Sequence, residues 1–263
     1  MPTAKSADGV QIEYTVFGKP EAKALELGRL GVFMACGGEA LRDFSQTLTH
    51  PNAMMEMRGL GKSSRPASRY DYSVPLYAKD IVAVMDENKV SAGVVIAYSH
   101  GVEGAVYLAM NEPSKVKALV LIEPDLFPDQ EIRRERLRLA EEGKLEDALR
   151  LTFSYVKPQM SHKELEEGIK YVLDAYGGSA EALIGEFRAR SLFQVDEDQL
   201  AHIQVPTLVI GGTLSSIRSS VTRTARAIPG ANVVWLKGAD HFMTGGYGAK
   251  AAKAVSSFLD LLD

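Results

Sequence analysis

The chain has 263 residues, 46% hydrophobic and 24% charged, which is the ordinary balance of a soluble globular protein and excludes disorder over most of its length. Its net charge of -4 gives no field that would attract nucleic acid or an anionic membrane, and no apolar run reaches the roughly 18 residues that cross a bilayer. The first residues lack the apolar core of a signal peptide, and the single cysteine excludes an intrachain disulfide, so we expect a cytoplasmic protein that acts on a small molecule. These properties leave the oligomeric state open.

The predicted elements alternate between strands and helices. Residues 10–17 alternate apolar and polar side chains, as in an amino-terminal antiparallel hairpin. Continuous apolar runs of about five residues, typical of strands buried on both faces of a parallel sheet, then recur along the chain. These runs are 31–35, 53–57, 94–98, 118–122, 207–210 and 232–236, with helical patterns over 76–87, 101–110 and 247–262. The alternation predicts a doubly wound, mostly parallel α/β sheet.

The alternation is interrupted once, over residues 124–202. This segment contains helical, charge-rich sequence and no convincing core strand. An insertion of roughly 75–80 residues is too long for a structureless loop, and at the carboxyl edge of a parallel sheet it would lie over the ligand site. We therefore expect residues 1–123 and 203–263 to form the core and 124–202 to form a helical cap.

The strongest local motif is Ala97-Tyr-Ser-His-Gly101, directly after a predicted strand and directly before a predicted helix. This small-x-Ser-x-Gly pattern is typical of a nucleophile elbow, a strained turn that presents the hydroxyl of Ser99. The positive end of the following helix would stabilise negative charge that develops beside it. An ordinary turn serine is the alternative, but strand, turn and helix together favour a nucleophile.

A serine nucleophile requires a base, and the chain has five histidines. They are His50, His100, His162, His202 and His241. His241 lies after the last predicted strand, which is the place that the order nucleophile, acid, histidine requires. A solvated loop histidine is the alternative interpretation of His241.

With these motifs the whole chain resembles an α/β-hydrolase. The resemblance rests on the amino-terminal hairpin, the segment Arg58-Gly-Leu-Gly-Lys-Ser63, the elbow at Ser99 and the late His241. It implies the fold described above, a serine hydrolase activity, and neither a metal nor an organic cofactor.

The resemblance also implies an oxyanion hole. By position, the backbone N–H of Gly37 or Gly38 and that of His100 would donate to the oxyanion. Cys36 stands where the family usually has histidine, which leaves these backbone donors in place but changes the support beneath them.

The acid departs from the usual arrangement of the family. Leu214 stands where most members carry aspartate after the seventh strand, whereas Glu123 directly follows the sixth strand, next to the strand of Ser99. We therefore predict a triad of Ser99, His241 and Glu123. An ion pair between Glu123 and a cap arginine is the alternative, and we expect no chemical part for Asp125, beyond Pro124.

An acid after the sixth strand is also found in fungal zearalenone lactonases, which this chain resembles in length and in the interval from serine to glutamate. The resemblance implies an apolar lactone or ester as substrate, with a zearalenone-type lactone the most specific prediction. Apolar cap residues could line the pocket, although helix packing is the commoner use of such side chains. They are Leu126, Phe127, Phe153, Tyr155, Tyr171, Tyr176, Phe187, Leu192 and Phe193.

Two further interpretations stay open. The same triad could hydrolyse a carbon–carbon or amide bond, or the protein could be a ligand sensor with little turnover, because a fold does not determine a function. Repeated turnover would distinguish an enzyme from a sensor.

Overall fold

The computed structural model describes residues 1–18, 32–36, 42–243 and 245–262. Within these residues eight strands form one sheet in the order β1-β2-β4-β3-β5-β6-β7-β8. Strand β2 pairs antiparallel with β1 and β4, and the pairs from β4 to β8 are parallel. The strands are β1 Thr3–Lys5, β2 Gln11–Phe17, β3 Val32–Cys36, β4 Asn52–Glu56, β5 Gly93–Tyr98, β6 Val116–Ile122, β7 Thr207–Gly212 and β8 Asn232–Leu236. The predicted sheet is confirmed, and the predicted strand ends are right to within about two residues.

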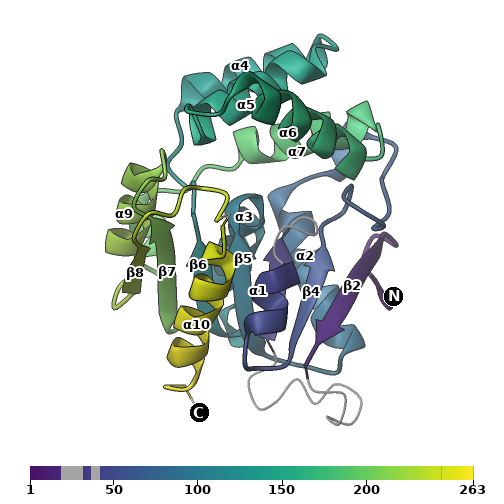
Figure 1. The fold of residues 1–263 in the computed structure, drawn as a ribbon. Coiled ribbons are helices and arrows are strands. Elements are labelled where there is room, and N and C mark those ends of the chain that lie inside the picture. Colours follow the sequence, from purple (N-terminus) through teal and green to yellow (C-terminus); the bar gives the residue numbers. More distant parts are fainter. Residues whose placement is uncertain (19–31, 37–41, 244, 263) are drawn as a thin grey trace.

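Helices cover both faces of this sheet, which is why its central strands β5 and β6 are apolar except for the exposed Lys117 near the start of β6 (Figure 1). Helices α2, Val74–Glu87, and α3, Val102–Asn111, pack with α9, Arg218–Ala227, on one face. Helices α1, Arg42–Thr47, and α10, Tyr247–Leu259, pack on the other. Helix α10 ends at Leu259, three residues before the predicted end at residue 262.

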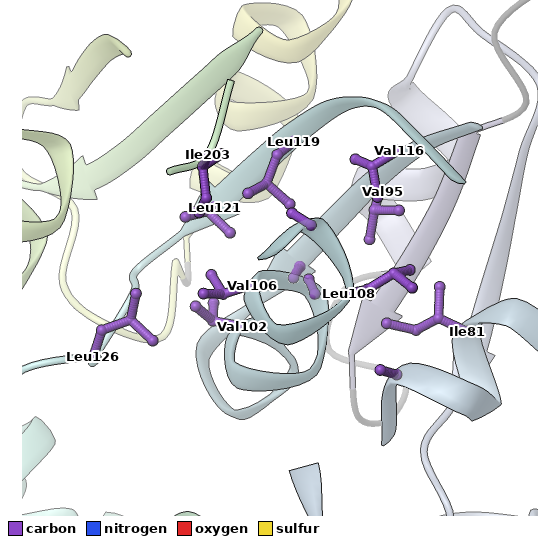
Figure 2. Close-up of a cluster of buried hydrophobic side chains, with 14 of the residues drawn as sticks. Ile81, Val95, Val102, Val106, Leu108, Val116, Leu119, Leu121, Leu126 and Ile203 are labelled. Carbon is purple, nitrogen blue, oxygen red and sulfur yellow. The ribbon is translucent and has the colours of Figure 1, made fainter. Parts of the chain in front are cut away.

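The core shows this two-faced burial in single residues. In β5, Val95 and Ala97 point to the α2–α3 face, while Val94 and Ile96 point to the α10 face. Figure 2 shows Val95 beside side chains of α2, α3 and β6 in the first of these clusters. Buried apolar packing on both faces fixes the position of each strand along its axis. It therefore also fixes where the strands end relative to one another.

Four helices lie together over the end of the sheet at the top of Figure 1. They are α4 Gln130–Glu141, α5 Leu145–Val156, α6 His162–Ala175 and α7 Ala180–Leu192. A short helix, α8, Glu197–Leu200, follows them and contacts α9. Among the described residues, no helix is both long and apolar enough to pass through a membrane.

Local sequence explains where two of these helices begin. The Asp129 carboxylate accepts hydrogen bonds from the backbone of Glu131 and Ile132, and so caps α4. Ser161 and Glu164 form a capping box at the start of α6. Side-chain caps therefore fix the starts of α4 and α6 within the charge-rich segment.

Candidate active site

Ser99 lies in a strained turn between β5 and α3. It begins a single 3-10 turn, Ser99–Gly101, and its φ of 48° lies in the left-handed region that side chains disfavour. Oγ of Ser99 lies 3.0 Å from Nε2 of His241. The turn thus presents the hydroxyl to the imidazole at hydrogen-bonding distance.

His241 follows β8 and is held from several sides. Its Nδ1 lies 3.1 Å from Oε2 of Glu123, and the imidazole is buried. The Tyr98 hydroxyl donates to the His241 backbone carbonyl at 2.8 Å, and the two rings stack. Because an ionised carboxylate only accepts hydrogen bonds, we assign the proton of a neutral imidazole to Nδ1 and leave Nε2 free to accept from Ser99.

Glu123 follows β6 and is completely buried. The backbone N–H of Gly212 donates to Oε1 at 2.6 Å, and the Ser215 hydroxyl donates to Oε2 at 2.5 Å. Both donors belong to the end of β7 and the loop after it. The side chain of Leu214 in the same loop is 62% exposed. Most family members carry the triad aspartate in this loop after β7. Here the end of β7 and the loop instead donate hydrogen bonds to the carboxylate of Glu123, which follows β6.

Three other carboxylates, those of Asp125, Asp240 and Asp196, lie in different contacts. Asp125 accepts from the Tyr155 hydroxyl at 3.3 Å and lies 3.9 Å from a guanidinium nitrogen of Arg133. Asp240 pairs with Lys157 at 3.0 Å and accepts from the following backbone, as a turn former does. Asp196 caps α8.

The predicted oxyanion donors are only partly described. Gly37 and Gly38 lie outside the described residues, and β3, which ends at Cys36, pairs with β5 through Ala35 and Ala97. His100 directly follows Ser99 in the 3-10 turn. Burial lowers the pKa of its imidazole, and among the described residues nothing partners the buried Nε2.

The residues expected to line an apolar pocket fall into two groups. Most are buried or half-buried, and Phe153 packs on Phe242, which in turn packs edge-on against His241. Tyr171 and Leu192, however, are 52% and 65% exposed, so neither is buried in an enclosed pocket. Both lie on helices whose other faces supply the packing, so these two side chains face away from the interior.

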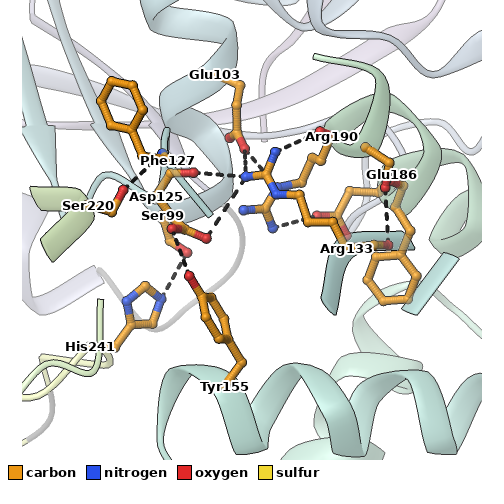
Figure 3. Close-up of polar contacts among 12 residues, drawn as sticks. Ser99, Glu103, Asp125, Phe127, Arg133, Tyr155, Glu186, Arg190, Ser220 and His241 are labelled. Atoms are coloured by element: carbon orange, nitrogen blue, oxygen red, sulfur yellow. Dashed lines mark hydrogen bonds and ion pairs between the residues drawn. The ribbon is translucent and has the colours of Figure 1, made fainter. Parts of the chain in front are cut away.

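The sequence did not reveal a buried group of charges between α3, α4 and α7. Glu103 Oε1 accepts from Arg133 and from Arg190, and Arg190 also pairs with Glu186 (Figure 3). Burial opposes ionisation of Glu186, but Arg190, His100 and Arg136 outweigh burial and hold its pKa below the usual value. Through Glu103 these contacts connect α3, the helix that follows the turn of Ser99, to α4 and α7. A signal was present, because Arg133 and Arg136 lie three residues apart on one face of α4.

Among the residues that the structure describes, no three histidine, cysteine, aspartate or glutamate side chains come together as metal ligands would.

Comparison with known proteins identifies a shared fold. A family model described as the alpha/beta hydrolase fold matches residues 50–243. A protein of Caulobacter segnis, whose assigned activity of carbamate hydrolase is itself provisional, is 30% identical over 138 residues, which is 50% of this chain. The match covers 49% of that relative, so the chain spans about half of its length.

Solved structures match almost the whole chain. An enol-lactonase from Burkholderia xenovorans superposes with a TM-score of 0.77 at 19% identity, over 98% of this chain and 100% of the other. A thermophilic esterase from Thermogutta terrifontis gives a TM-score of 0.78 at 18% identity, over 99% and 98%. An esterase from Exiguobacterium antarcticum gives 0.77 at 18% identity, over 98% of both chains. At these identities the likeness concerns the fold.

Proposed function

The chain belongs to the alpha/beta hydrolase fold family, and from this premise and the contacts of Ser99 we propose that it hydrolyses ester bonds of small molecules, including cyclic esters. The observation that carries the proposal is the continuous line of contacts from Ser99 Oγ to His241 and from His241 to Glu123. A hydroxyl is a weak nucleophile, and this line supplies the base and the group that orients the base.

In the proposed reaction Ser99 Oγ attacks the ester carbonyl carbon while Nε2 of His241 takes the hydroxyl proton. The carbonyl oxygen becomes an oxyanion, and the backbone N–H of His100, with one from Gly37 or Gly38, would stabilise it. The C–O bond then breaks, His241 returns the proton to the leaving alcohol, and an acyl-enzyme remains. Water attacks the acyl carbon with the same base and releases the acid. Glu123 keeps the imidazole in the required tautomer and stabilises its protonated form.

We take residues 124–202 as a cap that covers this site, and we expect the reaction to occur in the cytoplasm without a bound metal or organic cofactor. An apolar substrate fits the aromatic side chains beside the base, because Phe242 packs edge-on against His241 and Phe153 packs on Phe242. A zearalenone-type lactone is the most specific substrate to test. Carbamate hydrolysis is the second candidate, and the Caulobacter segnis relative supports it.

The test is covalent labelling with a fluorophosphonate followed by a turnover assay. We expect the probe to label Ser99, and Ser99→Ala to abolish labelling and to lower turnover by several orders of magnitude, about 10⁶-fold in a serine hydrolase where the loss was measured. Ser256→Ala, at another buried serine, is the matched control and should keep both. Release of an amine and carbon dioxide rather than an alcohol and acid would favour a carbamate, and full labelling of Ser99→Ala would exclude the proposed nucleophile.

A further inference from the structure

Arg136 on α4 carries a guanidinium that is buried and incompletely bonded. The residue is 5% exposed, and no described residue accepts a hydrogen bond from its Nε or its Nη2. These two N–H groups point in the same direction and form the side-on fork with which arginine binds a planar carboxylate through two parallel hydrogen bonds. The unused donors are therefore a matched pair.

The surroundings of Arg136 hold the guanidinium in place without using this fork. Its plane lies over the ring of Phe187, 4.4 Å from the ring centre. Glu186 is the attractive neighbour, but its two oxygens already accept from Tyr176 and Arg190. Burial, together with Arg190, lowers the pKa of Arg136 to about 9, so the group is still charged at neutral pH. A buried charge with free donors costs free energy unless a ligand pairs with it.

The other two buried arginines of this region are bonded differently. Arg133 donates to Glu103 and to the backbone carbonyls of Asp125 and Arg190, and Arg190 donates to Glu103 and Glu186 (Figure 3). Three arginines face the carboxylates of Glu103, Glu186 and Asp125, so the formal charges balance. The unused fork, rather than a surplus of charge, distinguishes Arg136.

Arg136 and the residue that follows the nucleophile share one charged neighbour, Glu186. Glu186 interacts electrostatically with Arg136 and also with His100, the residue that follows Ser99. His100 in turn has a buried Nε2 that no described residue partners. Unpartnered polar groups thus occur both at His100, next to Ser99, and at Arg136, and Glu186 interacts with both residues.

We propose that Arg136 binds a carboxylate of the substrate, so that the enzyme prefers esters or lactones that carry a second, free carboxylate remote from the bond that is cleaved. The inference rests on the proposed function, whose substrate class it narrows. It favours an anionic ester over a neutral zearalenone-type lactone, which has no group to fill the fork.

The first experiment compares two series of p-nitrophenyl esters. One series comprises the half-esters of succinate, glutarate and adipate, and the other the neutral methyl diesters of the same lengths. Arg136→Met keeps an unbranched apolar side chain against Phe187 but removes the fork. We expect it to lower kcat/KM for the best half-ester about 10- to 100-fold, as the loss of a charge-assisted bidentate pair implies, and to leave the neutral series within about twofold.

Two variants control this comparison. Arg138→Met lies on the exposed face of the same helix and should change neither series. Arg136→Lys keeps the charge without the fork and should recover only part of the preference. If wild type treats both series alike, or if Arg136→Met slows both equally, the carboxylate site is wrong although the hydrolase function stands.

A second experiment measures binding without turnover. Free glutarate or adipate should raise the Tm of the wild-type protein more than the corresponding monoamide does, and should not raise that of Arg136→Met. Stabilisation by a dicarboxylate without any ester turnover would support the site and exclude the proposed function. Equal stabilisation of wild type and Arg136→Met, or equal stabilisation by inorganic phosphate, would exclude a carboxylate fork at Arg136.

Discussion

Glu123 has two carboxylate oxygens and three hydrogen-bonding neighbours. Gly212 and Ser215 donate to it, and Nδ1 of His241 lies 3.1 Å from Oε2. An ionised carboxylate accepts from all three, whereas an amide in its place would turn its own N–H groups toward at least one donor. Charge and shape at position 123 are therefore both specified by the surroundings.

Glu123→Gln is expected to lower kcat by at least about 10²-fold, because the amide no longer selects the required imidazole tautomer, a change that costs about 10⁴-fold in a serine protease. Leu214→Ala is the control, and with a side chain that is 62% exposed it should change the free energy of unfolding by no more than about 0.5 kcal/mol. Turnover and thermal melts of both variants check this. A folded Glu123→Gln protein with wild-type turnover would show that another group orients His241.

The imidazole of His100 should make stability depend on pH. Burial lowers its pKa in the folded protein below the usual value of about 6.5, so the unfolded chain takes up a proton first as the pH falls. The contribution of His100 is complete above about pH 6.5 and is lost as the pH falls through the lower, folded value, by up to about 1.4 kcal/mol per pH unit.

Urea unfolding between pH 8 and pH 5 measures this effect. We expect the free energy of unfolding to decline below about pH 6.5, and His100→Gln to flatten the decline. His162→Gln removes a histidine whose side chain is 86% exposed and should leave the profile unchanged. Equal pH profiles for wild type and His100→Gln would rule out this origin of the dependence.

At the scale of elements, the turn between β5 and α3 adopts a strained backbone conformation, and this conformation presents the hydroxyl of Ser99. Ser99 adopts a φ of 48°, and Gly104 on α3 lets that helix approach α2, since a Cβ there would come within 2.9 Å of Tyr77. Strain at a functional residue persists when the elements on both sides over-determine it. Buried strand β5 and buried helix α3 do so here.

Replacements of Ser99 that differ only in a methyl group reveal this strain. Ser99→Gly should be more stable than Ser99→Ala by roughly 0.5–1 kcal/mol, because glycine adopts a positive φ without cost and the gain exceeds its greater freedom when unfolded. The same pair at Ser256, inside α10, should show the opposite sign by about 1 kcal/mol. Thermal melts of the four variants decide it, and a less stable Ser99→Gly would argue against a strained turn.

Strand positions could be predicted because continuous apolar runs mark burial on both faces. Strand β7 shows the limit of that signal, since the apolar run ends at Ile210 while the strand continues through Gly211 and Gly212, paired with Trp235 and Leu236. Glycine has no side chain to mark burial, and here a Cβ on Gly212 would meet the Ala239 carbonyl. The hydrophobic pattern therefore could not predict that β7 extends to Gly212, whose N–H donates to Glu123.

At the scale of the whole molecule, sequence predicted a charge-rich helical region but not that part of its charge is buried. Polar periodicity marks a face of a helix and does not say whether water or another polar face covers it. Arg133 and Arg190 meet Glu103 from α3, a partner 30 and 87 positions away along the chain. Only the folded arrangement brings these three residues together. They meet where α3, which packs on the sheet, faces α4 and α7.

Glu103 is the group through which α3 binds both α4 and α7. Its Oε1 lies 3.1 Å from Nη2 of Arg133 and 2.9 Å from Nε of Arg190, all of them buried.

Glu103→Gln removes the charge and leaves two guanidinium groups with one anion fewer. Loss of one partner of a buried pair costs about 3–5 kcal/mol, so we expect a much lower midpoint of urea unfolding and faster proteolysis between β6 and α4. Glu142→Gln, which removes a surface partner of Arg138 on α4, should lower the free energy of unfolding by no more than about 1 kcal/mol. If the two variants unfolded at the same midpoint, Glu103 would not hold α4 and α7 to α3, and the attachment of these helices would have to come from the apolar contacts that the four helices share with the loop after β4 and with α2.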